Sequence, residues 1–335
     1  MVLRLIEVVL PEENTRGIQE LLKEQQLLSI WFKELSEGQM LVRILLLAEK
    51  VDGVLDILEK NFGMITDFRI IILPVEATMP RPAEEKPPKK EGTEPEKKSN
   101  ADRISREELY TDITGSTRLS NVYVAMILLS SIVAAFGLLK NNIAVIIGAM
   151  VIAPMLGPNM ALSLATTLGD IVLARTALKA SATGILIALI ISVLAGFIFT
   201  VNPDIPEIAS RTKVELDDVA IALASGSAGA LAFTTGVSAI LIGVMVAVAL
   251  LPPLVTFGLM LGSGNEQLAS GALLLFFVNI ICVNLAGVIT FLAQGIRPKT
   301  WWEADKAMRM TRIAIGLWII LLLSLIIVIL LLQKS

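Results

Sequence analysis

NNIAVIIGAMVIAPMLGPNMALSLATTL, at Asn141–Leu168, is related to a second stretch of the chain, GVSAILIGVMVAVALLPPLVTFGLMLGS, at Gly236–Ser263. Aligned without a gap, Ala144–Leu178 and Ala239–Leu273 are identical at 13 of 35 positions. The identical positions include Gly148/Gly243, Met150/Met245, Leu156/Leu251 and Pro158/Pro253. Two apolar helices can look alike by composition alone, but chance agreement seldom keeps proline and glycine in step. We therefore interpret the chain as containing an internal duplication with an offset of 95 residues.

The composition is typical of an integral membrane protein. Of 335 residues, 55% are hydrophobic, the mean hydropathy is +0.75, and most charges lie outside the long apolar runs. The chain starts with MVLRLIEVVLPEEN, in which Arg4 and Glu7 interrupt a short apolar run, so we expect no signal peptide. The single cysteine, Cys282, excludes an intramolecular disulfide, and the lack of histidine removes the commonest metal ligand.

Residues 1–76 are predicted to form a small cytosolic α+β domain. Hydrophobic periodicity predicts strands at Val2–Leu10, Leu28–Leu35, Gln39–Ala48 and Thr66–Val75, and helices at Asn14–Gln25 and Val51–Phe62. This βαββαβ order indicates a ferredoxin-like domain. It has 8 basic and 13 acidic residues, which argues against nucleic acid as a partner. The domain is either a small-molecule sensor or trimerising module, or a solvated domain that aids assembly.

The next stretch, 77–118, is predicted to be a charged linker and an interfacial segment. Ala77–Asn100 contains five prolines and eleven charged residues, so it cannot bury enough apolar surface to fold and should be a tether. Asp102–Ser120 is partly amphipathic and is predicted to be a helix at the membrane surface.

The remainder, 119–335, is predicted to be an α-helical multi-pass transmembrane domain with about seven spans. The apolar segments run approximately from 120 to 139, 141 to 168, 180 to 200, 219 to 235, 237 to 262, 270 to 294 and 313 to 332. The first six form the two copies, 120–200 and 219–294, and the helix at 313–332 stands outside the repeat. With three spans in each copy, the copies should run in opposite senses, as a 3+3 inverted repeat.

The loops predict an orientation in the cell (inner) membrane. Gly295–Arg312 is basic, whereas Val201–Asp218 is acidic. Because basic loops stay in the cytoplasm, we expect the N-terminus to be cytoplasmic and the C-terminus to be outside.

Proline interrupts the second and the fifth segment near the middle of each. A proline frees the carbonyl one turn earlier, and at membrane depth such carbonyls lie inside protein or line a cavity. Two facing breaks would therefore form a substrate pathway, although both could be packing kinks without a ligand. Asn279 and Asn284 in the sixth segment could line this pathway or bond between helices. The pathway residues are Pro154, Gly157, Pro158, Asn159, Pro252, Pro253, Asn279 and Asn284.

Several classes of activity lack their residues in this sequence. The apolar segments contain no buried carboxylate or cation, which argues against a proton pump or a voltage sensor. The sequence has no nucleotide-binding loop, no metal-ligand cluster and no histidine for a catalytic triad. We therefore expect no enzyme activity, no cofactor and no metal.

The stretches GAMVIAPMLGPNMALSL (Gly148–Leu164) and VALLPPLVTFGLML (Val248–Leu261), with the N-terminal domain and the charged tether, resemble a family of bacterial and archaeal membrane proteins. This family is domain of unknown function 389, the uncharacterised hydrophobic domain proteins. The resemblance implies a multi-pass protein of the cell membrane and supplies no substrate or binding residues. The sequence favours a passive or weakly coupled transporter or channel for a small solute or ion, in contact with membrane lipid and assembled as a homo-oligomer. The alternative is a membrane scaffold or sensor that does not transport.

Overall fold

The structure is a computed structural model that describes residues 3–15, 17–23, 25–65, 67–75, 78, 104–235, 239–296 and 301–334. Side chains are not described at 37, 239–249, 301–308, 310 and 332–334. The chain forms two compact units, Met1–Leu109 and Tyr110–Ser335. The predicted tether lies outside the described residues, except for residue 78.

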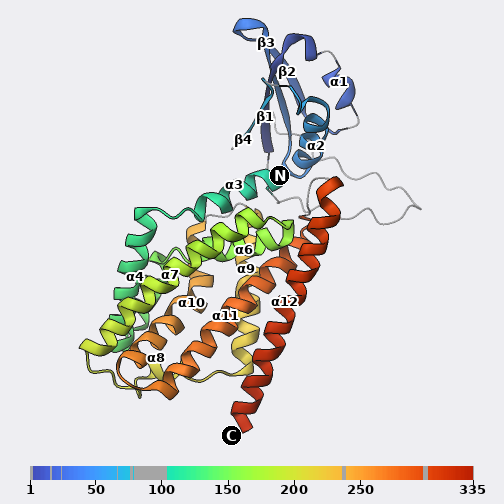
Figure 1. The fold of residues 1–335 in the computed structure, drawn as a ribbon. Helices are drawn as coiled ribbons and strands as arrows, with labels where there is room; N and C mark the ends of the chain where they lie inside the picture. Colours follow the sequence, from blue (N-terminus) through green and yellow to red (C-terminus); the bar gives the residue numbers. More distant parts are fainter. Residues whose placement is uncertain are drawn as a thin grey trace. The chain divides into compact units, whose positions relative to one another are not determined.

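The N-terminal unit contains a four-stranded antiparallel sheet (Figure 1). Its strands are β1 (Leu3–Pro11), β2 (Ser29–Glu34), β3 (Gln39–Leu47) and β4 (Arg69–Val75). They lie in the order β2-β3-β1-β4, so β1 and β3 are central. Each strand begins and ends within three residues of its predicted bounds, because alternating Val, Ile and Leu mark it in the sequence.

The core of this unit lies on one face of the sheet. Alternate residues of the central strands point to this face, namely Ile6, Val8, Leu10, Val42, Ile44 and Leu46. Helix α2 spans Val51–Phe62, the bounds predicted, and packs Val54 and Leu58 against them. Helix α1 contains only Ile18–Leu21 and adds Ile18. The longer helix predicted at Asn14–Gln25 is wrong, because Gly17 has a φ of 108°, a left-handed conformation that starts the helix late.

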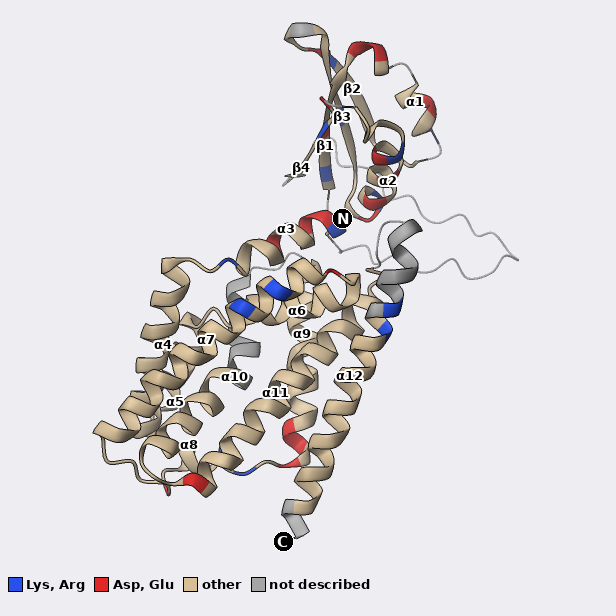
Figure 2. Cartoon of the chain, in the orientation of Figure 1, with Lys and Arg blue, Asp and Glu red and all other residues tan. Residues whose placement is uncertain are grey.

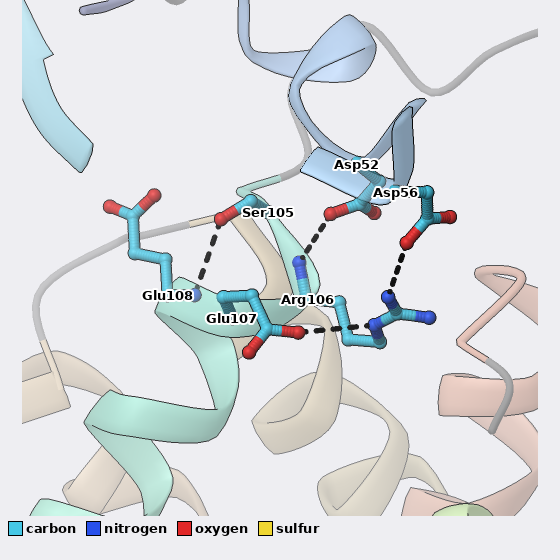
Figure 3. A network of polar contacts seen from close by, with 6 residues as sticks. All are labelled: Asp52, Asp56, Ser105, Arg106, Glu107 and Glu108. Carbon is cyan, nitrogen blue, oxygen red and sulfur yellow. Dashed lines mark hydrogen bonds and ion pairs between the residues drawn. The ribbon is translucent and has the colours of Figure 1, made fainter. Parts of the chain in front are cut away.

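Helix α3 (Arg106–Ser116) begins in the N-terminal unit, and the division between the units falls inside it. Its first turn is held by α2, as Figure 3 shows. The Arg106 backbone N–H donates to Asp52 Oδ1 at 2.9 Å, and the Arg106 guanidinium pairs with Asp56 at 3.1 Å. An N–H in a first helical turn lacks a partner within the helix, so the Asp52 carboxylate takes the role of a cap.

A second ion pair joins β1 to the same turn. The Arg4 guanidinium donates from Nε and Nη2 to the two carboxylate oxygens of Glu108, each at 2.9 Å. Both side chains are largely buried, and two parallel bonds of this kind fix orientation as well as distance. Of the helix predicted at 102–120, the structure has Arg106–Ser116 as helix, and residues 102 and 103 lie outside the described residues. The first turn of this helix is bonded to the N-terminal unit.

The second unit is built from apolar helices, which Figure 1 shows running in alternating directions between two ends. Their bounds are α4 (Asn121–Leu139), α5 (Ile143–Ile152), α6 (Leu156–Leu168), α7 (Ile171–Ile198), α8 (Pro206–Ala209), α9 (Leu216–Thr235), α10 (Ala239–Gly262), α11 (Glu266–Ala293) and α12 (Trp301–Lys334). Among the described residues, five helices are long and apolar enough to cross a membrane, and α5 with α6 makes six if that bent pair is one span. The prediction of seven spans stays a prediction, because side chains of α10 are described only from residue 250 on.

Two predicted boundaries and one predicted break in this unit are wrong. Helix α7 begins nine residues before the predicted 180, because Asp170 accepts the N–H groups of Val172 and Leu173 at 2.9 Å and caps it there. The basic link before the last span is helical from Trp301 on. Helix α10 continues through Pro252 and Pro253. A proline removes one hydrogen bond of a helix, but helical backbone can persist where neighbouring helices pack around it.

The turn that ends the second segment recurs 95 residues later. Gly169 and Gly264 have φ values of 69° and 80°, and each is followed by the residue that starts a long helix. The same backbone bond is made in both turns, from Asp170 N–H to Ala165 O and from Asn265 N–H to Met260 O, each at 2.9 Å. The two similar stretches of sequence therefore form the same turn at this point.

Charged residues of this unit are concentrated at its two ends (Figure 2). The basic residues in the first part of α7 lie near one end, and the acidic start of α9 lies near the other. Between the ends, α11 is 72% buried along its apolar window and forms the centre of the unit, whereas α12 is only 11% buried. The apolar helices and this charge pattern are those of a multi-pass membrane protein.

Candidate functional site: a polar cluster at the helix break

The break between α5 and α6 lies at Ala153–Met155, and the two helices meet there at 54°. Ala153 has extended backbone with ψ 117°, the conformation that a following proline imposes. Pro154 therefore ends α5, as the sequence predicts. Gly157 in the first turn of α6 also fits the break, because a Cβ at this position would lie 2.6 Å from the carbonyl oxygen of Ser116. Only glycine allows the end of α3 to approach α6 so closely.

Three polar side chains meet next to the break, from α6 and from the middle of α11. The Asn284 side-chain amide donates from Nδ2 to Asn159 Oδ1 at 3.0 Å and to the Ile280 carbonyl at 2.8 Å. The Asn159 amide donates to the Met155 carbonyl at 2.8 Å. Ser163 Oγ lies 3.2 Å from Asn284 Oδ1 and 3.1 Å from the Asn159 carbonyl. A single hydroxyl proton can serve only one of these acceptors at a time.

The polar cluster, defined as Asn159, Ser163 and Asn284, is closed to solvent. Asn284 and Ser163 are fully buried, and Asn159 is 3% exposed. Two amides and a hydroxyl are expensive in an apolar interior unless they are bonded, and here they bond to one another and to carbonyls. The three side chains therefore satisfy one another in this conformation, and a polar ligand that bound here would have to replace these bonds.

A small cavity adjoins Asn159 on the side of α4 and α7. Its volume is about 10 Å³, close to the least space that holds one water molecule. Pro158, Ser181 and Leu250 contribute to its wall. The Ser181 hydroxyl is buried and has no hydrogen-bond partner among the described residues. The cavity is thus a small space with a free hydroxyl beside the polar cluster.

The residues predicted for the pathway are only partly brought together. Pro154, Gly157, Pro158 and Asn159 form the break, and Asn284 joins them from α11. Pro252 and Pro253 lie inside continuous α10, so the second of the two predicted breaks is wrong. Asn279 lies on α11, 6% exposed, more than one turn before Asn284. The sequence did not point to Ser181 and Tyr123, which lie in the cavity wall. Neither residue lies next to a proline, and neither is matched by the same residue 95 positions later.

Two serine–glycine contacts are related by the same offset of 95 residues, and we call the second one the mirrored contact. A Cβ at Gly287 on α11 would lie 2.6 Å from Ser163 Oγ on α6, and a Cβ at Gly258 on α10 would overlap Ser192 Oγ on α7. Ser163 and Gly258 are 95 residues apart, as are Ser192 and Gly287. The serine–glycine contact of α6 with α11 thus recurs between α10 and α7, with serine and glycine exchanged.

The polar cluster has no polar counterpart at the mirrored contact. The positions 95 residues from Asn159 and Asn284 are Leu254 on α10 and Leu189 on α7, and these two helices pack closely. The positions that correspond to the two amides are therefore leucines, on two helices that also pack closely.

The fold and the cluster define a helical membrane protein with an N-terminal α+β unit and a polar centre at a broken helix. The model of the domain of unknown function DUF389 matches residues 150–285, which include the break and all three residues of the polar cluster. An uncharacterized protein of Methanocaldococcus jannaschii is 36% identical over 330 residues, which cover 98% of this chain and 99% of that protein. The chain belongs to the DUF389 family, as its sequence indicated. No solved structure matches it significantly.

Proposed function

We propose that this protein is a passive or weakly coupled transporter or channel for a small polar solute or ion. Its pathway passes the polar cluster at the break between α5 and α6. The cluster is closed in this conformation, because its members are buried and the adjoining cavity is about 10 Å³. Transport then requires α6 and α11 to separate, which exposes the Asn159 and Asn284 amides to the solute.

The observation that carries this proposal is the difference between the mirrored helix contacts. Helices α7 and α10 pack closely with leucines at positions 189 and 254, so close packing of such a pair does not need amides at these positions. Placing Asn159 and Asn284 at the other contact costs desolvation that packing does not require. Polar side chains retained within a membrane at such a cost mark solute pathways.

The proposal includes a specific architecture. The strand order β2-β3-β1-β4 supports a ferredoxin-like N-terminal domain, which would gate or assemble the protein. The exchanged serine–glycine contacts and the recurring turn at Gly169 and Gly264 support a 3+3 inverted repeat, in which each copy supplies the same surface to the other. The basic first part of α7 at one end and the acidic start of α9 at the other support a cytoplasmic N-terminus and an outer C-terminus across seven spans of the cell membrane.

The test first replaces Cys282, the single cysteine, with alanine. It then introduces one cysteine at a time at two buried serines and compares how fast each is labelled. Ser163→Cys lies in the polar cluster, and Ser192→Cys lies at the mirrored apolar contact; both serines are fully buried. A small water-soluble thiosulfonate should label Ser163→Cys at least ten times faster than Ser192→Cys, since only the former lines a path that opens. Proteoliposomes should show permeability to urea, glycerol, Na⁺ or Cl⁻ that labelling of Ser163→Cys blocks. Equal labelling of the two variants and no permeability to any of these probes would contradict transport.

A second function, a membrane scaffold or sensor without transport, is favoured by one observation. The cavity beside the break is only about 10 Å³, and the described hydrogen bonds pair both amides of the cluster. Such a centre would hold α6 and α11 together and pass no solute. Slow labelling of both serines, together with a ligand-dependent change in the N-terminal domain, would favour this function.

A further inference from the structure

The sheet of the N-terminal unit has a second face, opposite α1 and α2, that no described element of this unit covers. Alternate strand residues point to it and form rows across the four strands. One row contains Ser29, Leu45, Leu5 and Leu73, and the next contains Trp31, Arg43, Glu7 and Ile71. We call these two rows the open face. In Figure 1 both helices lie on the other side of the strands.

The open face exposes large apolar side chains. Trp31 is 49% exposed, Ile71 is 40% exposed and Leu73 is 38% exposed. They lie on the two edge strands, while Leu5 and Leu45 on the central strands are half-buried between them. Apolar residues that adjoin one another on a surface mark an interaction site more reliably than scattered ones do.

An ion pair lies in the middle of the open face. Arg43 donates from Nε to Glu7 Oε1 at 2.8 Å, directly across the β1–β3 ladder. The Glu7 side chain is 16% exposed and the Arg43 side chain is 48% exposed, so the arginine keeps donors free for a partner. The face thus combines an apolar surface with both signs of charge at its centre.

The apolar side chains and the ion pair of the open face favour one of three candidate occupants, which are the tether, a bilayer and a second copy of the chain. The tether at Ala77–Asn100 is composed mainly of charged residues and prolines, so it offers little to an apolar surface. A bilayer would take the Glu7–Arg43 ion pair out of water and offer it no further polar partner, at a cost of several kcal/mol per ion. A second copy of the face supplies both apolar side chains and the opposite charges, because a surface with a central ion pair is complementary to itself about a two-fold axis.

We propose that the open face binds the open face of a second copy of this chain. Each Arg43 then lies beside the partner's Glu7, and Trp31, Ile71 and Leu73 are removed from water. Lys33 and Arg69, which end the neighbouring row, remain at the rim in contact with solvent. Anchoring in one membrane raises the local concentration of the copies, so a modest surface suffices for pairing. The interaction does not depend on whether the protein transports.

The test uses the full chain in membranes with Cys282 replaced by alanine and one cysteine introduced at a time. Trp31→Cys and Ile71→Cys lie on the open face, whereas Asn61→Cys and Lys60→Cys lie on the exposed side of α2. With a short bis-maleimide, the open-face variants, alone or mixed with each other, should form covalent dimers at least five times faster than the α2 variants. Equal rates at the two faces, or no dimers at the open face, would overturn the proposal.

A charge variant provides an independent measurement. Leu73→Glu should reduce cross-linking through Ile71→Cys at least tenfold, because two carboxylates would be buried at the interface, whereas the control Asn61→Glu should leave it unchanged. Unfolding temperatures of both variants should stay within a few degrees of the parent, since both side chains are exposed. If Leu73→Glu cross-links like the parent, or if the N-terminal unit binds anionic vesicles through this face instead, pairing of copies is wrong.

Discussion

The Asn284 amide donates to Asn159 Oδ1 at 3.0 Å and so joins the middle of α11 to the first turn of α6, directly after the helix break. The two residues are 125 positions apart, and the proposed repeat assigns them to different copies. This bond links the copies at the point where Pro154 has already ended one helix. It is therefore the polar connection on which both the stability and the proposed opening of the unit depend.

Removing one partner of this bond should cost more than removing both. In Asn284→Leu, Asn159 Oδ1 loses its donor in a buried site, and we expect a loss of about 1–2 kcal/mol in the free energy of unfolding. The double variant Asn159→Leu with Asn284→Leu copies the leucines of the mirrored contact and should recover about 1 kcal/mol. Reversible unfolding in mixed detergent micelles measures both values. Strictly additive losses would show that the two amides do not interact.

The same double variant separates stability from transport. We expect it to fold and to lose permeability, because the polar cluster no longer offers amides to a solute. The matched control is Leu254→Ile on the mirrored contact, which should leave permeability as it was. A double variant that conducts like the parent would place the pathway elsewhere.

Most elements of the fold could be predicted from the sequence because each has a strong local pattern. The periodicity of Val51–Phe62 fixed both ends of α2, and the Pro154 break was visible as a proline within an apolar run. The short α1 could not be predicted, since its late start depends on the left-handed Gly17 rather than on any pattern of apolar residues. The early start of α7 depends on the Asp170 cap, whereas hydropathy placed the segment only after Lys179.

The candidate site was predictable in part. Asn159 and Asn284 could be selected because amides are rare within apolar segments, but their pairing required knowing that α6 and α11 touch. The expectation of two breaks failed at Pro252 and Pro253, because sequence shows that a proline weakens a helix and not whether surrounding helices hold it together. The free hydroxyl of Ser181 has no signal in the sequence at all.

The two glycines of the recurring turn should respond alike to substitution. Gly169→Ala and Gly264→Ala each force a side chain into a left-handed conformation, at a cost of about 1 kcal/mol. Gly148→Ala is the control, because a Cβ there meets nothing within 4 Å and an alanine inside α5 should stabilise by about 0.5–1 kcal/mol. Thermal unfolding in detergent measures all three. A large loss at only one of the two turn glycines would argue that the turns are not equivalent.

The Arg4–Glu108 pair should be important for attachment of α3 to the N-terminal unit. Arg4→Ala leaves Glu108 largely buried without its two bonds, so we expect a loss of about 1–3 kcal/mol in the stability of this unit. Arg43→Ala, which breaks the more exposed pair with Glu7, should cost no more than about 1 kcal/mol. Limited proteolysis with cleavage sites mapped around α3 gives the readout. Equal resistance of parent and Arg4→Ala would show that the pair does not hold this helix.

The serine–glycine contacts allow a test of the repeat itself. Gly287→Ser places a side chain against Ser163 and should cost about 1–3 kcal/mol, as overpacking does in a tight helix contact. Adding Ser163→Gly transfers the serine from α6 to α11, which is the arrangement that Ser192 and Gly258 have at the mirrored contact. If the two copies are related by a two-fold axis, the double variant should recover most of the lost stability. Its serine on α11 would then pack against glycine on α6 as Ser192 on α7 packs against Gly258 on α10. Unfolding of the single and double variants in mixed micelles decides this, with Gly148→Ser as a control for serine within a helix. A double variant no more stable than Gly287→Ser would mean that the contacts only resemble each other.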